Sequence, residues 1–191
     1  VGPAGDAYAP DTQLDPHDAM LLHVPQIHAL GRANVDMISA MTLTHVGEAI
    51  GIVRAAQEID IPVVIAFTLE TDGRLPSGQL LDEAIGEVDA ATNSGPIYYM
   101  IKCAHPDHFR NVLATGADWV LRIGGVRSNA SRLSHAELDE AEELDDGDPA
   151  ELGRLNAELL TLLPNIRVLG GCCGTDHRHV GCMAGHRHTG L

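Results

Sequence analysis

The sequence lacks the features of membrane proteins and of proteins that bind nucleic acid. No apolar run reaches the roughly 18–20 residues that a transmembrane helix needs, and no basic leader precedes an apolar stretch. Basic residues are few: Lys102 is the only lysine among 12 basic residues, and the formal net charge is −15. A surface of this sign repels phosphate backbones and anionic lipids, so we expect neither nucleic acid nor membrane partners.

Cysteine is also sparse, and its pattern argues against a disulfide-rich secreted domain. The chain has four cysteines in 191 residues, and two of them are adjacent, unlike the paired framework of small secreted proteins. A reducing, cytoplasmic location fits this pattern better. Histidine is frequent, and five of the 11 histidines lie in polar stretches of the C-terminal third, where we expect most to be solvated: His135, His177, His179, His186 and His188.

Short apolar runs alternate with longer helical stretches along the chain. The runs typical of buried strands are Val35 to Leu43, Pro62 to Leu69, Ile97 to Cys103, Trp119 to Ile123 and Ile166 to Leu169. The stretches typical of helices are Pro16 to Arg32, His45 to Ile59, Gly78 to Ala91, Pro106 to Ala114 and Pro149 to Leu163. This alternation predicts an α/β fold with a parallel sheet, either an open doubly wound sheet or a (β/α)8 barrel.

Nothing in the sequence divides the chain into domains, so we expect one domain over residues 1–191. There is no internal repeat or linker, and the acidic stretch Asp139 to Asp148 is expected to be a solvated loop or helix rim. No Gly-x-Gly-x-x-Gly follows a predicted strand, so a dinucleotide-binding fold has no support. The start, Val1-Gly2-Pro3, resembles the end of a strand and suggests a chain that begins inside a fold.

The adjacent pair Cys172 and Cys173 is the most informative motif. It stands in Gly170-Gly171-Cys172-Cys173-Gly174-Thr175, directly after the predicted strand Ile166 to Leu169. Neighbouring cysteines form a disulfide with each other only through a strained ring. Both thiols can instead bind one soft metal ion if the backbone turns sharply, which the flanking glycines permit.

Cys103 supplies a third thiol at a comparable place. It ends the strand Ile97 to Cys103, about 70 residues before the pair, and the carboxyl ends of parallel strands gather functional groups at one rim. Three thiolates leave one position open on a tetrahedral zinc, as in catalytic sites, and would bring the sulfurs to about 4 Å of one another. The alternatives are inert buried cysteines, or ligation by His177 or His179; Cys182 is expected to be a bystander.

These residues resemble the signature of the homocysteine S-methyltransferase family, whose members include betaine-homocysteine methyltransferase and the homocysteine module of methionine synthase. The resemblance rests on the double-cysteine motif with Cys103, and it extends to Val1-Gly2-Pro3, to Asp36 to Thr44 with Glu48-Ala49, and to Phe67-Thr68 with Asp72-Gly73 and Gly78. It implies a (β/α)8 barrel that lacks its first strands, here about strands three or four to eight. It also implies zinc held by Cys103, Cys172 and Cys173.

Two positions depart from the family's pattern. Lys102 stands where the family usually has Asn before the strand-end cysteine; it either balances the negative charge of three thiolates or points away toward a helix. Met41 stands where several relatives have an acidic residue. Because Met41 cannot hold a substrate ammonium, we interpret it as core packing.

The implied activity is zinc-dependent transfer of a methyl group to the thiol of homocysteine, which gives methionine. The partners would be this small thiol acceptor and a small methyl donor, with a homo-oligomer possible because an incomplete barrel leaves a strand edge unpaired. From their places near the rim, we interpret Thr68, Glu70 and Asn129 as substrate contacts. The alternatives are a non-catalytic zinc-binding fragment that needs its missing N-terminal portion, or a redox-active Cys172–Cys173 dithiol.

Overall fold

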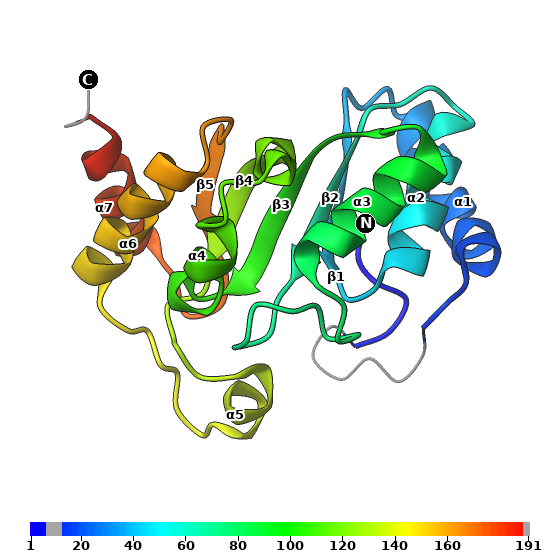
Figure 1. Cartoon of the computed structure of the whole chain (residues 1–191). Coiled ribbons are helices and arrows are strands. Elements are labelled where there is room, and N and C mark those ends of the chain that lie inside the picture. Colours follow the sequence, from blue (N-terminus) through cyan, green and yellow to red (C-terminus); the bar gives the residue numbers. More distant parts are fainter. Residues whose placement is uncertain (7–12, 189–191) are drawn as a thin grey trace. The chain divides into compact units, whose positions relative to one another are not determined.

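Helices and strands alternate along the chain in the computed structural model, which describes residues 1–6 and 13–188 (Figure 1). In chain order the elements are α1 (Pro16–Arg32), β1 (Ile38–Leu43), α2 (Val46–Gln57), β2 (Val63–Thr68), α3 (Leu81–Thr92), β3 (Pro96–Ala104), α4 (Pro106–Leu113), the 3₁₀ helix η1 (Asp118–Arg122), β4 (Ile123–Ser128), α5 (His135–Glu140), α6 (Pro149–Leu162), β5 (Val168–Gly171) and α7 (His177–His188). Among these described helices, none is long and apolar enough to cross a membrane.

The strands form a parallel sheet, as the alternation predicts. Their order in the sheet is β1-β2-β3-β4-β5. Strand β1 runs parallel to β2, with Ile38 opposite Val63, and β4 runs parallel to β5, with Ser128 opposite Gly171. The α/β fold class is therefore confirmed.

The chain divides into two compact units, 1–68 with 74–100 and 69–73 with 101–191. In the first unit, every residue of β2 is buried and nine residues of α2 face the core. Helix α1 begins as predicted, because the Asp15 carboxylate accepts hydrogen bonds from the backbone N–H groups of His17 and Asp18. Met41 is partly buried at an irregularity of β1, so its interpretation as core packing stays a prediction.

In the second unit, α6 packs its apolar side inward through Leu152, Leu155 and Leu159. Helices α6 and α7 approach closely at Gly153, where an added Cβ would lie 2.7 Å from the Cβ of Cys182. This contact gives Cys182 a packing role against α6, in agreement with its expected place outside the cysteine cluster.

One predicted strand was wrong and two helices were missed. The stretch Trp119 to Ile123 forms η1 for most of its length, and the strand begins only at Ile123. Its next two residues are the buried glycines Gly124 and Gly125, which lack the side chains that an apolar pattern would reveal. Helix α7 is rich in histidine and glycine and has no apolar periodicity, whereas α5 carries a Ser134–Glu137 capping box that the sequence does display.

Gly51 of α2 allows the close contact between α1 and α2, and Gly51→Ala tests it. An added Cβ would lie 2.6 Å from the Cβ of Ala19, so we expect a loss of about 1–3 kcal/mol in the free energy of unfolding. The matched control is Gly86→Ala on α3, where an added Cβ meets nothing within 4 Å. This substitution should raise the free energy of unfolding by about 0.5–1 kcal/mol, because alanine favours a helix more than glycine does. Urea unfolding measures both, and equal stability of the two variants would contradict this helix packing.

Candidate metal centre

Cys103 lies at the end of β3 in an unusual backbone conformation. Its φ is 55°, in the left-handed region, which costs a residue with a side chain about 1–3 kcal/mol and persists only where the surrounding structure holds it. The His135 ring helps to hold Cys103 in this conformation, since its Nε2 lies 2.8 Å from the Cys103 carbonyl oxygen. A carbonyl can only accept a hydrogen bond, so Nε2 donates. Both residues are buried, so the strand end is firmly held.

The turn that carries Cys172 and Cys173, the double-cysteine turn, is attached by hydrogen bonds to the end of β4 and the segment that follows it. The Cys172 N–H donates to the Ser128 carbonyl (2.8 Å), and the Ala130 N–H donates to the Cys173 carbonyl (3.0 Å). The Asn129 side-chain oxygen accepts a hydrogen bond from the Cys173 N–H at 3.1 Å. These bonds continue the β4–β5 ladder past its last pair and fix both cysteines beside the end of β4.

The three predicted sulfurs converge. The Sγ atoms of Cys103, Cys172 and Cys173 all lie within 4.8 Å of one another, and those of the adjacent pair are 4.0 Å apart. Tetrahedral zinc with Zn–S bonds of about 2.3 Å requires sulfurs about 3.8 Å apart. Cys103 is buried, Cys172 half-buried and Cys173 exposed, so one side of the cluster is open to an incoming ligand.

Cys103 and Cys172 are joined as a disulfide in this structure, with their Cα atoms 5.5 Å apart. The bond differs from the three thiolates expected from the sequence, and it does not join the adjacent pair as the dithiol alternative proposed. Thiolates, not disulfide sulfurs, ligate metals. The disulfide and a three-thiolate metal site are therefore two exclusive states of the same sulfurs.

Two of the three predicted substrate contacts lie beside this cluster. Glu70 and Asn129 line one narrow crevice together with Cys103 and His135, and the Glu70 carboxylate is 3.2 Å from Nδ1 of His135. Thr68 ends β2 in the first unit, where it is fully buried and its hydroxyl has no hydrogen-bond partner among the described residues.

The prediction that the C-terminal histidines are mostly solvated was wrong for His135 and His179. His179 is fully buried; its Nε2 lies 2.8 Å from the Asp146 carbonyl and its Nδ1 3.0 Å from the Asp176 carboxylate. It therefore supports a turn, and among the described residues the cysteines alone form a metal-ligating cluster. His177 is exposed, and the side chains of residues 186 and 188 lie outside the description.

The acidic stretch 139–148 is largely exposed, as predicted, but its end is attached beside the cysteine turn. The Asp145 carboxylate accepts a hydrogen bond from the Ser131 hydroxyl at 2.5 Å, which is the main reason that the pKa of Asp145 falls below its ordinary value. The Asp146 carboxylate pairs with Arg178 at 2.6 Å. The stretch thus covers one flank of the turn.

Two cations stand on the strands just before the cluster. The Arg127 Nε donates to the Gly171 carbonyl at 3.2 Å. Lys102 is half-buried; burial and then the Arg127 guanidinium lower its pKa, whereas the Cys173 thiol raises it.

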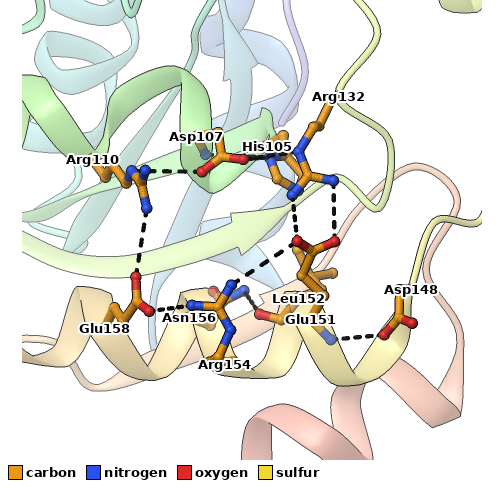
Figure 2. Close-up of polar contacts among 10 residues, drawn as sticks. All are labelled: His105, Asp107, Arg110, Arg132, Asp148, Glu151, Leu152, Arg154, Asn156 and Glu158. Carbon is orange, nitrogen blue, oxygen red and sulfur yellow. Dashed lines mark hydrogen bonds and ion pairs between the residues drawn. The ribbon is translucent and has the colours of Figure 1, made fainter.

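A network of ion pairs fixes the segment after β4 from its other side (Figure 2). Arg132 lies between Asp107 (2.8 Å) and Glu151 (2.9 Å), and Arg110 lies between Asp107 (3.5 Å) and Glu158 (3.6 Å). Burial alone would raise the pKa of Asp107, but the Arg132 hydrogen bond and neighbouring cations lower it. The Arg132 side chain is 48% exposed, so each pair contributes only about 0–1 kcal/mol.

The buried contact beneath this network is stronger. Asn156 of α6 is fully buried, and its oxygen accepts a hydrogen bond from the Ser128 hydroxyl (3.0 Å). Its amide donates to the Leu152 carbonyl (2.9 Å) (Figure 2). The adjacent His105 is also buried, and burial followed by the Arg132 charge lowers the pKa of His105 to about 4. A neutral His105 can then accept the Asp107 N–H that begins α4.

Comparisons with known proteins point to one family. The sequence model of the family described as homocysteine S-methyltransferase matches residues 1–186, whereas a comparison with curated protein sequences gives no match. Among solved structures, the chain is similar at 18% identity to the homocysteine methyltransferase MmuM from Escherichia coli, with TM-scores of 0.72 for its oxidized form, 0.64 for its metallated form and 0.65 for its apo form.

These alignments cover 95–97% of this chain but only 56–60% of the MmuM chains. The chain therefore spans less than two thirds of the length of the structures that it resembles. At this identity the likeness shows the fold, an α/β arrangement that corresponds to part of a (β/α)8 barrel, as the sequence predicts.

Replacing Asn156 should destabilise the second unit more than breaking the exposed network does. Asn156→Ala leaves the buried Ser128 hydroxyl without its acceptor, so we expect a loss of about 1–3 kcal/mol in unfolding free energy, against less than about 1 kcal/mol for Arg132→Ala. Asn165→Ala, which removes an exposed hydrogen bond, is the control. Denaturant unfolding of the three variants measures these losses. A larger loss of unfolding free energy for Arg132→Ala than for Asn156→Ala would show that the ion pairs contribute more to stability than the buried contact does.

Proposed function

We propose that this chain, which belongs to the homocysteine S-methyltransferase family, transfers a methyl group to the thiol of homocysteine and so forms methionine, with zinc held by Cys103, Cys172 and Cys173. The observation that carries the proposal is the convergence of these three sulfurs at the ends of two strands. Zinc is the metal that best suits a set of three thiolates in a reducing, cytoplasmic setting.

Three cysteine ligands fit a metal site that binds a substrate better than they fit a closed structural site. Three protein ligands leave the fourth position for a substrate, and the exposed side of the cluster at Cys173 gives access to it. When bound, zinc would deprotonate the acceptor thiol, whose ordinary pKa is about 8.5, and keep it nucleophilic at neutral pH. The Cys103–Cys172 disulfide must be reduced before the site can bind metal.

The residues around the cluster have separate tasks in this proposal. Asn129 fixes the Cys173 backbone through its side-chain oxygen, and its amide group is left to face the acceptor. Glu70, held by His135, offers a carboxylate for the acceptor's ammonium group. Thr68 is proposed as a further substrate contact on the basis of its unused hydroxyl.

A second candidate function follows from the fact that the chain covers only part of the length of the MmuM structures. The chain spans 56–60% of the MmuM chains, which suits one barrel-type domain that corresponds to about strands three or four to eight. On this reading the chain binds zinc but transfers methyl groups only when further strands complete the barrel, supplied by a longer polypeptide or by association into a homo-oligomer. The methyl donor would be a small molecule in either case.

The metal part of the proposal predicts one zinc ion per reduced chain. Cys172→Ala should lower zinc affinity by at least tenfold, because two thiolates cannot complete the site. Cys182→Ala is the matched control, since Cys182 packs against Gly153 outside the cluster. Elemental analysis after reduction and dialysis measures the metal; equal zinc content in both variants would refute ligation by Cys172.

The activity part predicts methionine formation from homocysteine. The chain alone and the intact open reading frame that contains it should be assayed by mass spectrometry with S-methylmethionine, S-adenosylmethionine, betaine and methylcorrinoid as donors. Activity of the chain alone supports the first candidate, and activity of the longer form only supports the second. Zinc binding without methionine from either form, with every donor, would exclude the methyltransferase reading.

A further inference from the structure

His135 connects the strand end that carries Cys103 with the segment that carries Glu70, and all three residues belong to the second unit. Its Nε2 lies 2.8 Å from the Cys103 carbonyl oxygen, and its Nδ1 lies 3.2 Å from the Glu70 carboxylate. Both ring nitrogens are therefore engaged. One imidazole ring holds the backbone of a proposed zinc ligand and, at the same time, a carboxylate from the segment after β2.

The backbone around His135 is itself held in place. His135 is the first residue of α5, and Ser134 caps this helix through the reciprocal hydrogen bonds of a capping box with Glu137. Just before them, the Leu133 N–H donates to the Ser131 hydroxyl at 3.0 Å. The His135 side chain is only 5% exposed, so the ring has little freedom to move away from its two partners.

Glu70 has a side that is open to a ligand. Its side chain is 33% exposed, and its contact with His135 uses Oε1, one of its two oxygens. Among the described residues that line the crevice beside Cys103, Glu70 is the only acidic one. His108 also lines this crevice, but its Nε2 lies 3.0 Å from the Arg132 carbonyl. An incoming hydrogen-bond donor therefore finds its acceptor at Glu70.

The contact between His135 and Glu70 requires one proton. Nε2 donates to a carbonyl, so in a neutral ring Nδ1 carries no hydrogen, and one proton must lie between Nδ1 and the carboxylate oxygen. With this proton the pair has no net charge. The pair therefore offers an ammonium group a hydrogen-bond acceptor, the other Glu70 oxygen, whose position the ring fixes, rather than a net negative charge.

We propose that His135 is a positioning residue that sets where the acceptor's amino group binds relative to its sulfur, and that it thereby makes the site select thiols that carry an amino group. One ring nitrogen holds the strand end of the zinc ligand Cys103, and the other holds the carboxylate that binds the amino group. This inference rests on the proposed function for the acceptor thiol and for Glu70, and it adds the residue on which their relative position depends.

Equilibrium binding to the reduced, zinc-loaded chain tests the preference without turnover. The probes are homocysteine and 4-mercaptobutyrate, which has the same thiol, carboxylate and chain length but lacks the amino group. Isothermal titration at about 150 mM salt should show about tenfold tighter binding of homocysteine, as expected for a hydrogen bond to a charged group. Glu70→Gln, on a partly exposed side chain, should remove most of this preference. Equal affinities for the two probes in the unmodified chain would overturn the proposal even if no His135 variant folded.

Two substitutions then separate the two contacts of the ring. Glutamine places an amide nitrogen near the position of Nε2, and asparagine places one near the position of Nδ1. His135→Gln should therefore keep zinc binding and lose most of the preference for homocysteine. His135→Asn should keep the preference and lower zinc affinity about tenfold, as is typical for contacts that orient a metal ligand.

His108→Gln is the matched control, because His108 lines the same crevice and its Nε2 lies against the Arg132 carbonyl. It should change neither zinc affinity nor the preference between the two probes. A loss of zinc and of both probes together in each His135 variant would show a structural role alone and would reject the proposal. A full preference for homocysteine in His135→Gln would reject it as well.

The outcomes also separate this inference from the proposed function. A preference for homocysteine that depends on His135, in a protein that forms no methionine, would leave the inference standing and reject the methyltransferase reading. Methionine formation by a protein that binds homocysteine and 4-mercaptobutyrate alike would do the opposite.

Discussion

The attachment of the double-cysteine turn to the end of β4 is the constraint on which the site depends. Adjacent cysteines on a free loop would have no defined relation to Cys103. Backbone hydrogen bonds from Cys172 to Ser128 and from Ala130 to Cys173 extend the parallel ladder beyond its last pair. They convert a local sequence motif into a fixed position beside the next strand, so the sulfurs meet across a sequence separation of 69 residues.

Buried polar contacts support this arrangement more than surface charges do. Asn156 under Ser128, and His135 under the Cys103 carbonyl, are inaccessible to solvent or nearly so, and a buried polar group that loses its partner is costly. The ion pairs of Arg132 and Arg110 are exposed and weaker individually. Their effect is to restrict the segment after β4, which carries Asn129.

The sequence allowed the fold class, most elements and the three thiols to be predicted, because each has a local signal. Helix α1 has its Asp15 cap, and the cysteines have glycine neighbours and strand ends. The strand Ile123–Ser128 was missed because Gly124 and Gly125 hide its apolar pattern. His135 was taken as solvated because its burial follows from contacts with Glu70 and Cys103, distant in sequence. Contacts between residues that are far apart in the sequence produce no periodic pattern in it.

The chain's overall charge and its local charges act in opposite directions on an anionic substrate. A net charge of −15 repels a thiol acid at long range. At physiological ionic strength, however, this repulsion is screened over about 8 Å, whereas a cation beside the cysteine turn, such as Arg127, acts on a ligand at short range. A local cation such as Arg127 can therefore offset the long-range repulsion, and the rest of the surface can remain acidic for solubility.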